Sequence, residues 1–591
     1  MIGPHLDRFR RAWSERLDET RIRLARPDAL LPLAGLGLFT GLIAGGVIVL
    51  FRLFVEGTQD ALLPGDGPEN YEALPLAARI VFPVVAALLL AAMFRWFAAG
   101  IQVLGVARVM ERMAYHQGRC TVRAFLLQFF GAALAIIGGH SVGREGPHIF
   151  LGASSGSLLG QSLELPNNVI RALVGCGTAA GIAASFNTPL AGVIFALEVV
   201  MMEYTVASFI PVILAAVSAT TLSNMVLGDR ASFVVPVMQM QSLTELLLVL
   251  FLGVAAGAVS AVFIQAVQSV AARGRSLAIE WRMLLAGGMV GGVALFLPGV
   301  MGIGYDSVDL ALHGEIALGL LFALLVGKVL ATSLCIGLGV PGGVIGPTLF
   351  IGAMLGALVA ELAALGSFGM ESKVGFFALL GMGAMMSGSL QAPLAALTAM
   401  LELTDNPAII MPGMLAVVVA GITASEAFGK DSLFLTMLRA GGLDYSASPL
   451  SQALRRIGVA SVMERAFLRV DGVVSVEEAR DALRAGPVFL VVDQAPGQQV
   501  VMPAADLARR LDAADPAGAA AAEADPIDLA EIPGTRLQAA VIELHANLHE
   551  ARKQFEDSGA EVLLVRRMTA PGIHRIYGVL TRESIDKAYR R

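Results

Sequence analysis

Ten stretches of 18 residues or more contain no charged side chain, and they set the pattern of the chain as far as residue 425. These stretches are Ala29–Phe51, Ala124–Gly143, Gly146–Leu163, Ala172–Leu197, Tyr204–Gly228, Leu246–Ala272, Met283–Tyr305, Val329–Ala360, Val374–Leu401 and Asn406–Ser425. A helix needs about 20 apolar residues to cross the ~30 Å hydrocarbon core of a bilayer. The pattern therefore predicts a polytopic, all-α membrane domain in which the longest stretches hold two shorter helices.

Glycine and proline interrupt several of these stretches, as in Gly138–Pro147 and Leu338–Pro347. Inside a bilayer, such breaks persist only where neighbouring protein or a watery cavity satisfies the freed backbone groups. We therefore expect tilted, re-entrant and half-length helices. Lys328 borders the longest stretch and is expected at the membrane interface.

The composition supports this assignment, because 56% of the 591 residues are hydrophobic and only 15% are charged. Soluble domains are about 25% charged, so a soluble enzyme and a disordered scaffold are excluded. A net charge of −6 gives no basic footprint for nucleic acid. The three cysteines lie in apolar runs and indicate neither a disulfide framework nor a metal site.

The two ends of the chain are more polar than its middle. Residues 1–28 mix seven arginines with acids and lack the apolar core of a secretory signal. They predict an amphipathic helix, and their arginine excess places it in the cytoplasm. The membrane domain is expected over residues 29–440 of a multi-pass protein of the inner or plasma membrane. Residues 441–591 are expected to form a cytoplasmic α/β region.

The C-terminal region contains a repeat. Glu478-Ala479-Arg480 recurs as Glu550-Ala551-Arg552, each followed by short β-like runs, and the alanine-rich residues 512–526 are typical of a linker. The region resembles a tandem of CBS modules, at about 455–511 and 527–591. In such modules, a Ser or Thr followed three residues later by Asp holds the ribose of an adenine nucleotide. Asp506 follows Pro503 and Thr581 precedes Ser584, so each module keeps half of that motif. Nucleotide binding stays open, and packing of a dimer interface is the expected role.

A second repeat lies inside the membrane domain. The sequence PHIFLGASSG from Pro147 matches PTLFIGAMLG from Pro347, and NTPLA from Asn187 matches QAPLA from Gln391. The offsets are 200 and 204 residues, which predicts two repeats, at about 29–230 and 240–440. In transporters, the ion site lies where broken helices of two such repeats meet.

In both repeats, a glycine-rich stretch ends in Gly-Pro before a predicted helix. Proline favours the first helical turn, and the exposed N–H groups of a helix start attract anions. Two such starts meeting in mid-membrane would bind an anion without a full positive charge.

Arg144 and Glu145 are two ionisable residues between charge-free runs, and intramembrane charges are functional by default. A carboxylate beside a helix start mimics an anion. Glu145 is therefore predicted to act as a gate that protonation releases, with Arg144 in a structural role. The alternative is an Arg144–Glu145 pair that is merely neutralised in the core.

These motifs resemble those of the CLC family of chloride channels and chloride/proton exchangers. GREGP is intact at residues 143–147, NTPLAG stands at 187–192, and GxFxP is altered at 343–347, with Ile345 in place of Phe. The resemblance covers about Arg10–Leu438. It implies inverted repeats and a homodimer with one pore per subunit in a lipid bilayer, with chloride as the transported ligand and no other cofactor.

The resemblance also shows departures from the family pattern. The family's GSGIP motif reads AAGIQ here, so that Ala99 replaces its serine, and Phe434 replaces a tyrosine of the last membrane helix. Anion binding is then left to the backbone and pore lining. The residues implied are Ala99, Gly100, Gly146, Val344, Ile345, Gly346 and Phe434.

The exchangers of this family use an inner glutamate for protons, and here Val199 stands in its position beside Glu198. This favours a passive anion channel gated by Glu145. A proton-coupled chloride exchanger on the same scaffold is the alternative. A membrane metalloprotease is a remote alternative, because such an enzyme would need an H-E-x-x-H motif, which the sequence lacks. The protein is therefore not expected to be an enzyme.

Overall fold

The computed structural model describes most of the chain in two compact units. The described residues are 24, 29–65, 68–98, 100–101, 104–228, 240, 242–243, 245–365, 373–443, 449–495, 498–514, 526–570 and 573–590. The membrane unit comprises Leu30–Leu163 and Ile170–Tyr445, and the C-terminal unit is built mainly from Ser446–Arg591 with the segment Glu164–Val169. Apart from Leu24, the predicted helix over residues 1–28 lies outside the described residues.

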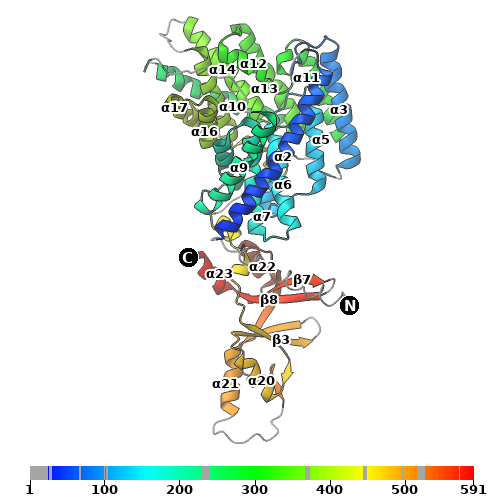
Figure 1. Ribbon diagram of the computed structural model, residues 1–591, viewed down its shortest axis with the longest axis vertical. Helices are drawn as coiled ribbons and strands as arrows, with labels where there is room; N and C mark the ends of the chain where they lie inside the picture. Colours follow the sequence, from blue (N-terminus) through cyan, green and yellow to red (C-terminus); the bar gives the residue numbers. More distant parts are fainter. Residues whose placement is uncertain are drawn as a thin grey trace. The chain divides into compact units, whose positions relative to one another are not determined.

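The membrane unit is helical throughout its described part (Figure 1). Its first half contains α2 (Leu30–Leu62), α3 (Ala78–Phe97), α4 (Val106–Tyr115), α5 (Val122–Ile137), α6 (Glu145–Ser162), α7 (Asn167–Phe186), α8 (Pro189–Phe195) and α9 (Val206–Leu227). Its second half contains α10 (Glu245–Gly274), α11 (Ile279–Ala294), α12 (Tyr305–His313), α13 (Leu318–Leu338), α14 (Ile345–Leu365), α15 (Val374–Leu390), α16 (Pro393–Thr404), α17 (Ile410–Ile422) and α18 (Leu433–Ala440). Among the described helical segments, eight are long and apolar enough to cross a membrane.

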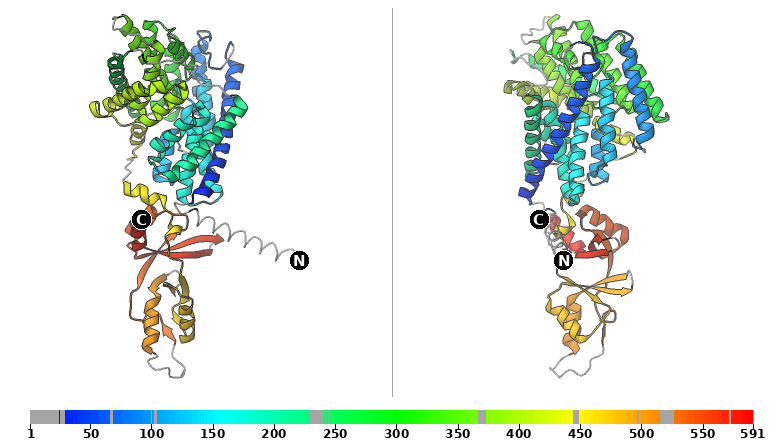
Figure 2. Two further views of the ribbon diagram at one scale, coloured as in Figure 1. Left: turned by 60° about the vertical axis from the view of Figure 1, so that its left-hand side comes forward. Right: turned by 45° about the vertical axis from the view of Figure 1, so that its right-hand side comes forward.

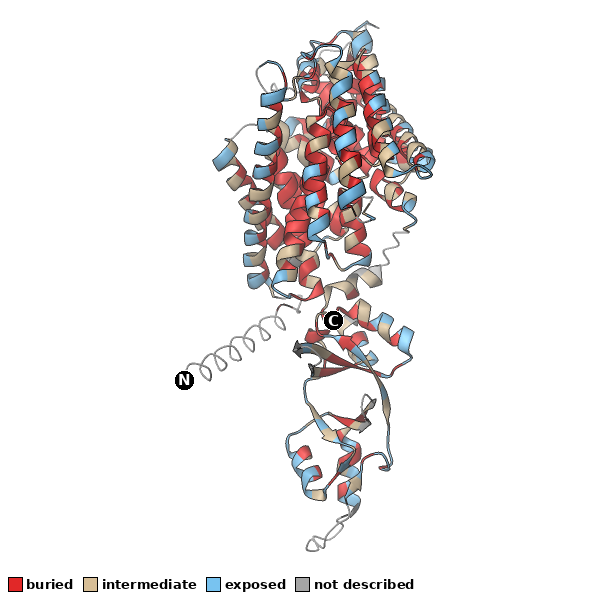
Figure 3. Ribbon diagram, turned by 90° about the vertical axis from the view of Figure 1, so that its right-hand side faces the viewer, coloured by how far each residue is buried: buried red, intermediate tan, exposed pale blue. Residues whose placement is uncertain are grey.

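Burial separates inner helices from outer ones. Nearly every residue of α6, α14 and α15 is buried, whereas α2, α3 and α10 expose large apolar side chains such as Phe39, Leu88 and Phe251 (Figure 3). Exposed leucine and phenylalanine along whole helices are expected of a surface that faces lipid rather than water. The membrane unit therefore buries the glycine-rich repeats at its centre.

The charge-free stretches located most of the helices but missed α3. Arg79 near its start and Arg95 in its last turn leave an uncharged stretch of only 15 residues between them, which is too short to predict a membrane-spanning helix. The longest stretch, Val329–Ala360, contains two helices as expected. The chain breaks between Leu338 and Ile345, where α13 ends and α14 begins.

The two halves of the membrane unit make equivalent contacts with each other. The N–H of Gly143 donates to the carbonyl of Gly343, and the N–H of Gly343 donates to the carbonyl of Gly143, both at 2.7 Å. Within each half, glycine lets two helices touch. A Cβ atom would lie 2.1 Å from the Gly177 carbonyl if placed on Gly152, and 2.3 Å from the Gly381 carbonyl if placed on Gly352.

The short helices α8 and α16 cap each other. The Glu198 carboxylate accepts hydrogen bonds from the N–H groups of Leu394 and Ala395, at 3.1 and 2.8 Å. The Glu402 carboxylate accepts from those of Leu190 and Ala191, at 2.8 and 2.7 Å. Each carboxylate thus satisfies orphan N–H groups at the start of a helix in the other half.

The C-terminal unit contains the same succession of elements twice. The first set is β1 (Phe467–Asp471), β2 (Val473–Val474), α20 (Val476–Arg484), β3 (Phe489–Ala495), β4 (Gln498–Pro503) and α21 (Ala504–Ala514). The second set is β5 (Ile527–Asp528), β6 (Leu537–Glu543), α22 (Leu548–Ser558), β7 (Val562–Ala570), β8 (Ile573–Thr581) and α23 (Arg582–Arg590). The helix α19 (Pro449–Arg456) precedes both.

Strand pairing repeats with the elements. The main sheet has the order β1-β3-β4-β6-β7-β8, with β1–β3 and β6–β7 parallel, and β3–β4 and β7–β8 antiparallel. Figure 2 shows the strands and helices of this unit, coloured yellow to red, in two further views. In both helices, the Glu of the recurring Glu-Ala-Arg forms a capping box with the residue just before the helix. The pairs are Ser475 with Glu478 in α20 and Asn547 with Glu550 in α22. The sequence repeat therefore marks equivalent helix starts.

Candidate functional site

Glu145 is the first residue of α6, at the place where the two halves of the membrane unit meet. The Gly143–Gly343 hydrogen bonds hold the start of α6 against that of α14, and Glu145 is fully buried. Proline in the first turn of each helix, Pro147 and Pro347, suits a helix start because its missing N–H has no intrahelical partner to lose.

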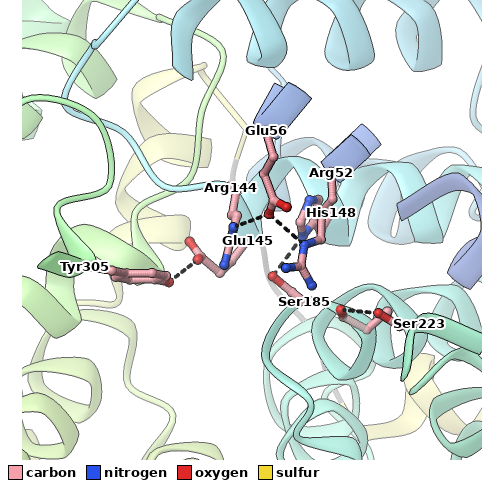
Figure 4. A network of polar contacts seen from close by, with 9 residues as sticks. Arg52, Glu56, Arg144, Glu145, His148, Ser185, Ser223 and Tyr305 are labelled. Atoms are coloured by element: carbon pink, nitrogen blue, oxygen red, sulfur yellow. Dashed lines mark hydrogen bonds and ion pairs between the residues drawn. The ribbon is translucent and has the colours of Figure 1, made fainter. Parts of the chain in front are cut away.

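The carboxylate of Glu145 points toward the start of α14. The N–H of Gly346 donates to its Oε2 at 3.1 Å, and the hydroxyl of Tyr305 donates to its Oε1 (Figure 4). A helix start carries unsatisfied N–H groups and a partial positive charge. The carboxylate therefore lies at the start of α14 and accepts one hydrogen bond from the backbone and one from a side chain.

Arg144 turns to a different partner. Its guanidinium Nη1 lies 3.1 Å from Oε1 of Glu56 on α2, which also accepts from Nε of Arg52 at 3.0 Å. The guanidinium carbon of Arg144 also lies 5.4 Å from the centre of the Tyr305 ring. The ion pair that the structure gives Arg144 is therefore with Glu56 and not with Glu145.

A second polar contact lies beside this network. His148 is fully buried one turn after Glu145, and its Nδ1 lies 2.8 Å from the Ser185 hydroxyl (Figure 4). The ring of His148 packs edge-on against Phe51, with the ring centres 5.2 Å apart. This histidine thus has partners of its own on α2 and α7.

Lys328 is not at the membrane interface, and that expectation is wrong. The side chain is fully buried, and Nζ donates to the carbonyls of Val300, Gly302 and Ile303, at 3.1, 2.9 and 2.9 Å. Nζ also lies 4.7 Å from the centre of the Phe350 ring. Three carbonyls and an aromatic face replace the water that a buried ammonium would otherwise need.

Lys328 thereby fixes the segment that carries Tyr305. Residues 300–303 lead through Gly304, whose positive φ of 82° starts α12, directly to Tyr305. Sequence reasoning missed Tyr305, Glu56 and Lys328 as site residues. The one local signal for Tyr305 was the Gly302-Ile303-Gly304 break that precedes it.

The other predicted anion-binding residues are placed as follows. Gly146, Val344 and Ile345 are buried at the two helix starts. Phe434 on α18 is buried against Phe195, with the ring centres 6.3 Å apart. Gly100 is described in a turn, and Ala99 lies outside the described residues. The structure therefore brings Glu145, Gly146, Val344, Ile345 and Gly346 together, and it gives no contact between this group and Gly100.

A small apolar cavity of about 20 Å³ lies beside the start of α14, and its lining includes Ile345, Phe186, Thr188 and Phe195. Phe195 also packs on Phe434, with the ring centres 6.3 Å apart. Phe186 approaches Tyr305, with the ring centres 6.4 Å apart.

Val199 is buried in the π-helical turn Ala196–Met201 that follows α8. Its neighbour Glu198 is the residue whose two carboxylate oxygens cap α16. The aliphatic side chain of Val199 cannot hold a proton, and the carboxylate of Glu198 is engaged by backbone.

In the C-terminal unit, the two candidate nucleotide contacts already have partners. The buried Asp506 accepts a hydrogen bond from the Thr535 N–H at 3.0 Å and pairs with Arg509. The Thr581 hydroxyl lies 2.9 Å from the Ser584 hydroxyl. Nucleotide binding there stays a prediction.

Comparison with known proteins gives one consistent result for the membrane unit. The family model described as "Voltage gated chloride channel" matches residues 84–425. The chain is 34% identical over 373 residues to a "Putative chloride channel protein ClcB-like" of Ralstonia nicotianae, covering 62% of this chain and 86% of that one. It is 32% identical over 323 residues to an "H(+)/Cl(-) exchange transporter ClcA" of Yersinia pestis, covering 52% of this chain and 66% of that relative.

Solved structures share the fold at lower identity. A slow cyanobacterial Cl−/H+ antiporter superposes with a TM-score of 0.62 at 23% identity, over 69% of this chain and 97% of that one. A eukaryotic CLC transporter superposes with a TM-score of 0.58 at 20% identity, over 94% of this chain and 98% of that one. The second superposition therefore extends into the C-terminal unit.

Proposed function

Because the chain belongs to the voltage-gated chloride channel (CLC) family, we propose that it exchanges chloride for protons across a membrane. In this proposal the Glu145 side chain binds at the start of α14 when it is ionised, and chloride binds there when Glu145 is protonated. This is the second of the functions expected from the sequence, placed here ahead of the passive channel. The relatives named as H(+)/Cl(−) exchange transporters support this order.

One observation carries the proposal, namely the position of the Glu145 carboxylate against the Gly346 N–H. A chloride ion at the start of α14 would use the same donor, so carboxylate and chloride compete for one place. Protonation removes the charge of Glu145 and with it the attraction to the helix start. The neutral side chain can then leave, and chloride replaces it.

This competition links the two ions. Each departure of Glu145 from the α14 start requires a proton, and each return displaces a chloride ion. If the protonated side chain exchanges its proton with the opposite face of the membrane, protons and chloride move in opposite directions. The Tyr305 hydroxyl stabilises the ionised side chain in its place, which keeps the path closed between proton transfers.

A passive channel is the second candidate, and Val199 is the observation that favours it. A valine offers no proton-carrying group at that position, and the adjacent Glu198 is held by the N–H groups of Leu394 and Ala395. In a channel, Glu145 would open and close the path without obligatory proton movement.

The test is the reversal potential of the purified full-length protein in liposomes under a chloride gradient, repeated with an opposing pH gradient. For an exchanger the pH gradient shifts the potential away from the chloride equilibrium value. A potential equal to the chloride value and indifferent to pH would establish the channel instead. An absence of chloride current would point to another anion.

The same proposal includes the assembly around this site. We take the protein to be a homodimer with one pore per subunit in the inner or plasma membrane, with both ends of the chain in the cytoplasm. We also take the C-terminal unit to be a CBS tandem, which its repeated β-α-β-β-α order supports, and we expect this tandem to pack the dimer interface. Cross-linking of the purified protein and protease access to tagged termini test these points.

A further inference from the structure

The segment between α2 and α3 is anchored beside the Glu145 site. Its described residues are 63–65 and 68–77, and together they are called the α2–α3 loop below. Tyr71 anchors this loop, because it is buried and its hydroxyl accepts from Nε2 of Gln59 at 2.8 Å and donates to the carbonyl of Ile136. The loop is thus tied to α2 and to the end of α5.

The ring of Tyr71 lies between two glycines that belong to the segments of the site. A Cβ atom would lie 3.2 Å from the ring if placed on Gly139, and 2.6 Å from it if placed on Gly302. The N–H of Gly302 donates to the carbonyl of Gly139 at 3.2 Å, so the two segments are joined at this point. One segment leads to Glu145 and the other leads to Tyr305. The α2–α3 loop therefore keeps a fixed place beside both site residues.

Glu69 lies two residues before Tyr71 and has an unusual backbone conformation. Its φ is 73°, in the left-handed region that residues with a side chain rarely adopt. Its carbonyl accepts from the N–H of Tyr71 at 2.7 Å. Such strain persists only where the surrounding structure fixes it, and it is concentrated at functional sites. The Tyr71 anchor supplies that fixation for Glu69.

The Glu69 carboxyl interacts with the charges of the site. The charged groups that act on it are Arg144 and Glu145 from the start of α6, Asp306 on α12 and Lys328 on α13. Tyr305 also interacts electrostatically with Glu69. Burial raises the pKa of the Glu69 carboxyl to about 7, and the two neighbouring acids add to this shift while the two cations oppose it. A carboxyl with a pKa near neutrality both takes up and releases protons at neutral pH.

The two glutamates differ in their access to solvent. Glu145 is fully buried, whereas Glu69 is half-buried in a loop outside the helices. This loop lies at the opposite end of α2 from Leu30, and a helix of 33 residues is about 50 Å long, which is enough to cross a bilayer. With both ends of the chain in the cytoplasm, as proposed above, the loop is at the outer face of the membrane. Glu69 thus has the contact with the outer solution that Glu145 lacks.

We propose that Glu69 transfers protons between the outer solution and Glu145. This inference rests on the proposed chloride/proton exchange and names the residue that serves its outer half. The protonated Glu69 carboxyl gives its proton to the ionised Glu145 carboxylate, directly or along bridging water, and the carboxylate left on Glu69 takes a new proton from the outer solution. In the opposite direction, protonated Glu145 gives its proton to ionised Glu69, which releases it to the outer solution.

The experiment compares proton and chloride fluxes of the full-length protein in liposomes under a chloride gradient. Glu69→Gln removes the titratable group and keeps the size of the side chain, and it is expected to lower the proton flux by about tenfold or more. Glu72→Gln is the matched control and should keep the wild-type proton flux. Glu72 is an exposed acid of the same loop, and the charged groups that act on it are Asp306, Arg79 and Lys328.

A second background separates proton transfer from a structural role of Glu69. In Glu145→Gln, chloride is expected to move without protons, so the addition of Glu69→Gln should leave the chloride flux unchanged. A lower chloride flux in this double variant would show that Glu69 only maintains the loop, and it would overturn the proposal. A wild-type proton flux in Glu69→Gln, or an equal loss in Glu72→Gln, would also overturn it.

The proposed exchange is judged separately, on the wild-type protein. If the wild-type protein moves protons and Glu69→Gln moves them equally well, the role of Glu69 alone is rejected. If the wild-type protein moves no protons under a chloride gradient, the exchange itself is rejected, and proton transfer through Glu69 is rejected with it.

Discussion

Replacing Tyr305 by phenylalanine removes one of the two hydrogen bonds to the Glu145 carboxylate and leaves the ring in place. The ring also contacts Phe186 and the Arg144 guanidinium, and neither of these two contacts uses the hydroxyl. A buried hydrogen bond to a charged group contributes about 1.5–3 kcal/mol. The ionised, closed arrangement should lose about that much stability, whereas the protonated and displaced side chain should lose little.

This difference moves the pH dependence of transport. At 1.36 kcal/mol per tenfold change in proton concentration, the pH of half-maximal chloride flux should rise by about one to two units in Tyr305→Phe. The assay is chloride efflux from liposomes over a range of pH, with the wild-type protein and the variant at equal protein-to-lipid ratios. Tyr204→Phe is the control, because Tyr204 is exposed on the segment before α9.

The reasoning fails if the flux profiles of Tyr305→Phe and wild type coincide while both proteins elute as the same species. In that case the hydroxyl would not hold Glu145 in its place, and the Gly346 N–H would act alone. A profile that moves to lower pH would also refute it, since the hydroxyl would then favour the open arrangement.

Three further predictions concern other parts of the molecule. Glu145→Gln should make chloride transport largely independent of pH, and a pH dependence that persists unchanged in efflux assays would show that Glu145 is not the switch. Lys328→Met leaves three buried carbonyls without a donor and should lower the free energy of unfolding by roughly 2–4 kcal/mol. The measurement is the unfolding midpoint in detergent, which should fall for this variant. Lys373 is exposed, so Lys373→Met should leave the midpoint unchanged. Hydrogen bonds from the Ser475 backbone and hydroxyl lower the pKa of Glu478 in the folded chain. The capping box therefore stabilises α20 fully at pH values above the usual pKa of a glutamate, and this contribution is lost as pH falls through the lowered pKa. The protection factors of the α20 amides, which are exchange rates corrected for the intrinsic effect of pH, should therefore fall in acid, and protection factors that do not respond would contradict this.

The sequence predicted those parts of the site that depend on local chain geometry. Gly-Pro before a helix, the repeat offset of 200 residues and a lone buried carboxylate located Glu145 and the start of α14 without any knowledge of the fold. In the C-terminal unit, the repeated Glu-Ala-Arg located two equivalent segments, and the structure shows that both are helix starts with capping boxes.

The missed residues are those whose partners are chosen by tertiary packing. Arg144 pairs with Glu56, 88 positions away on α2, and Tyr305 reaches Glu145 across 160 positions. Lys328 lies at the edge of an apolar stretch, and this position predicted a place at the membrane interface. The sequence does not show the three carbonyls that make the burial of Lys328 tolerable, so its burial could not be predicted. Helix α3 was missed because of local charges and not because of distant partners. Arg79 and Arg95 near its two ends leave an uncharged middle that is too short to indicate a membrane span.

The mutual capping of α8 and α16 has a consequence for the order in which the protein is made. The N–H groups of Leu190 and Ala191 donate to Glu402, which is synthesised 212 and 211 residues after them. Glu145 accepts from Gly346, which is synthesised 201 residues after it. At 5–20 residues per second, the ribosome needs about 10–40 s to supply these partners. Throughout that interval the newly inserted first half holds an uncapped helix and an unsatisfied carboxylate, so the contacts of Glu145 are completed only when the second half has entered the membrane.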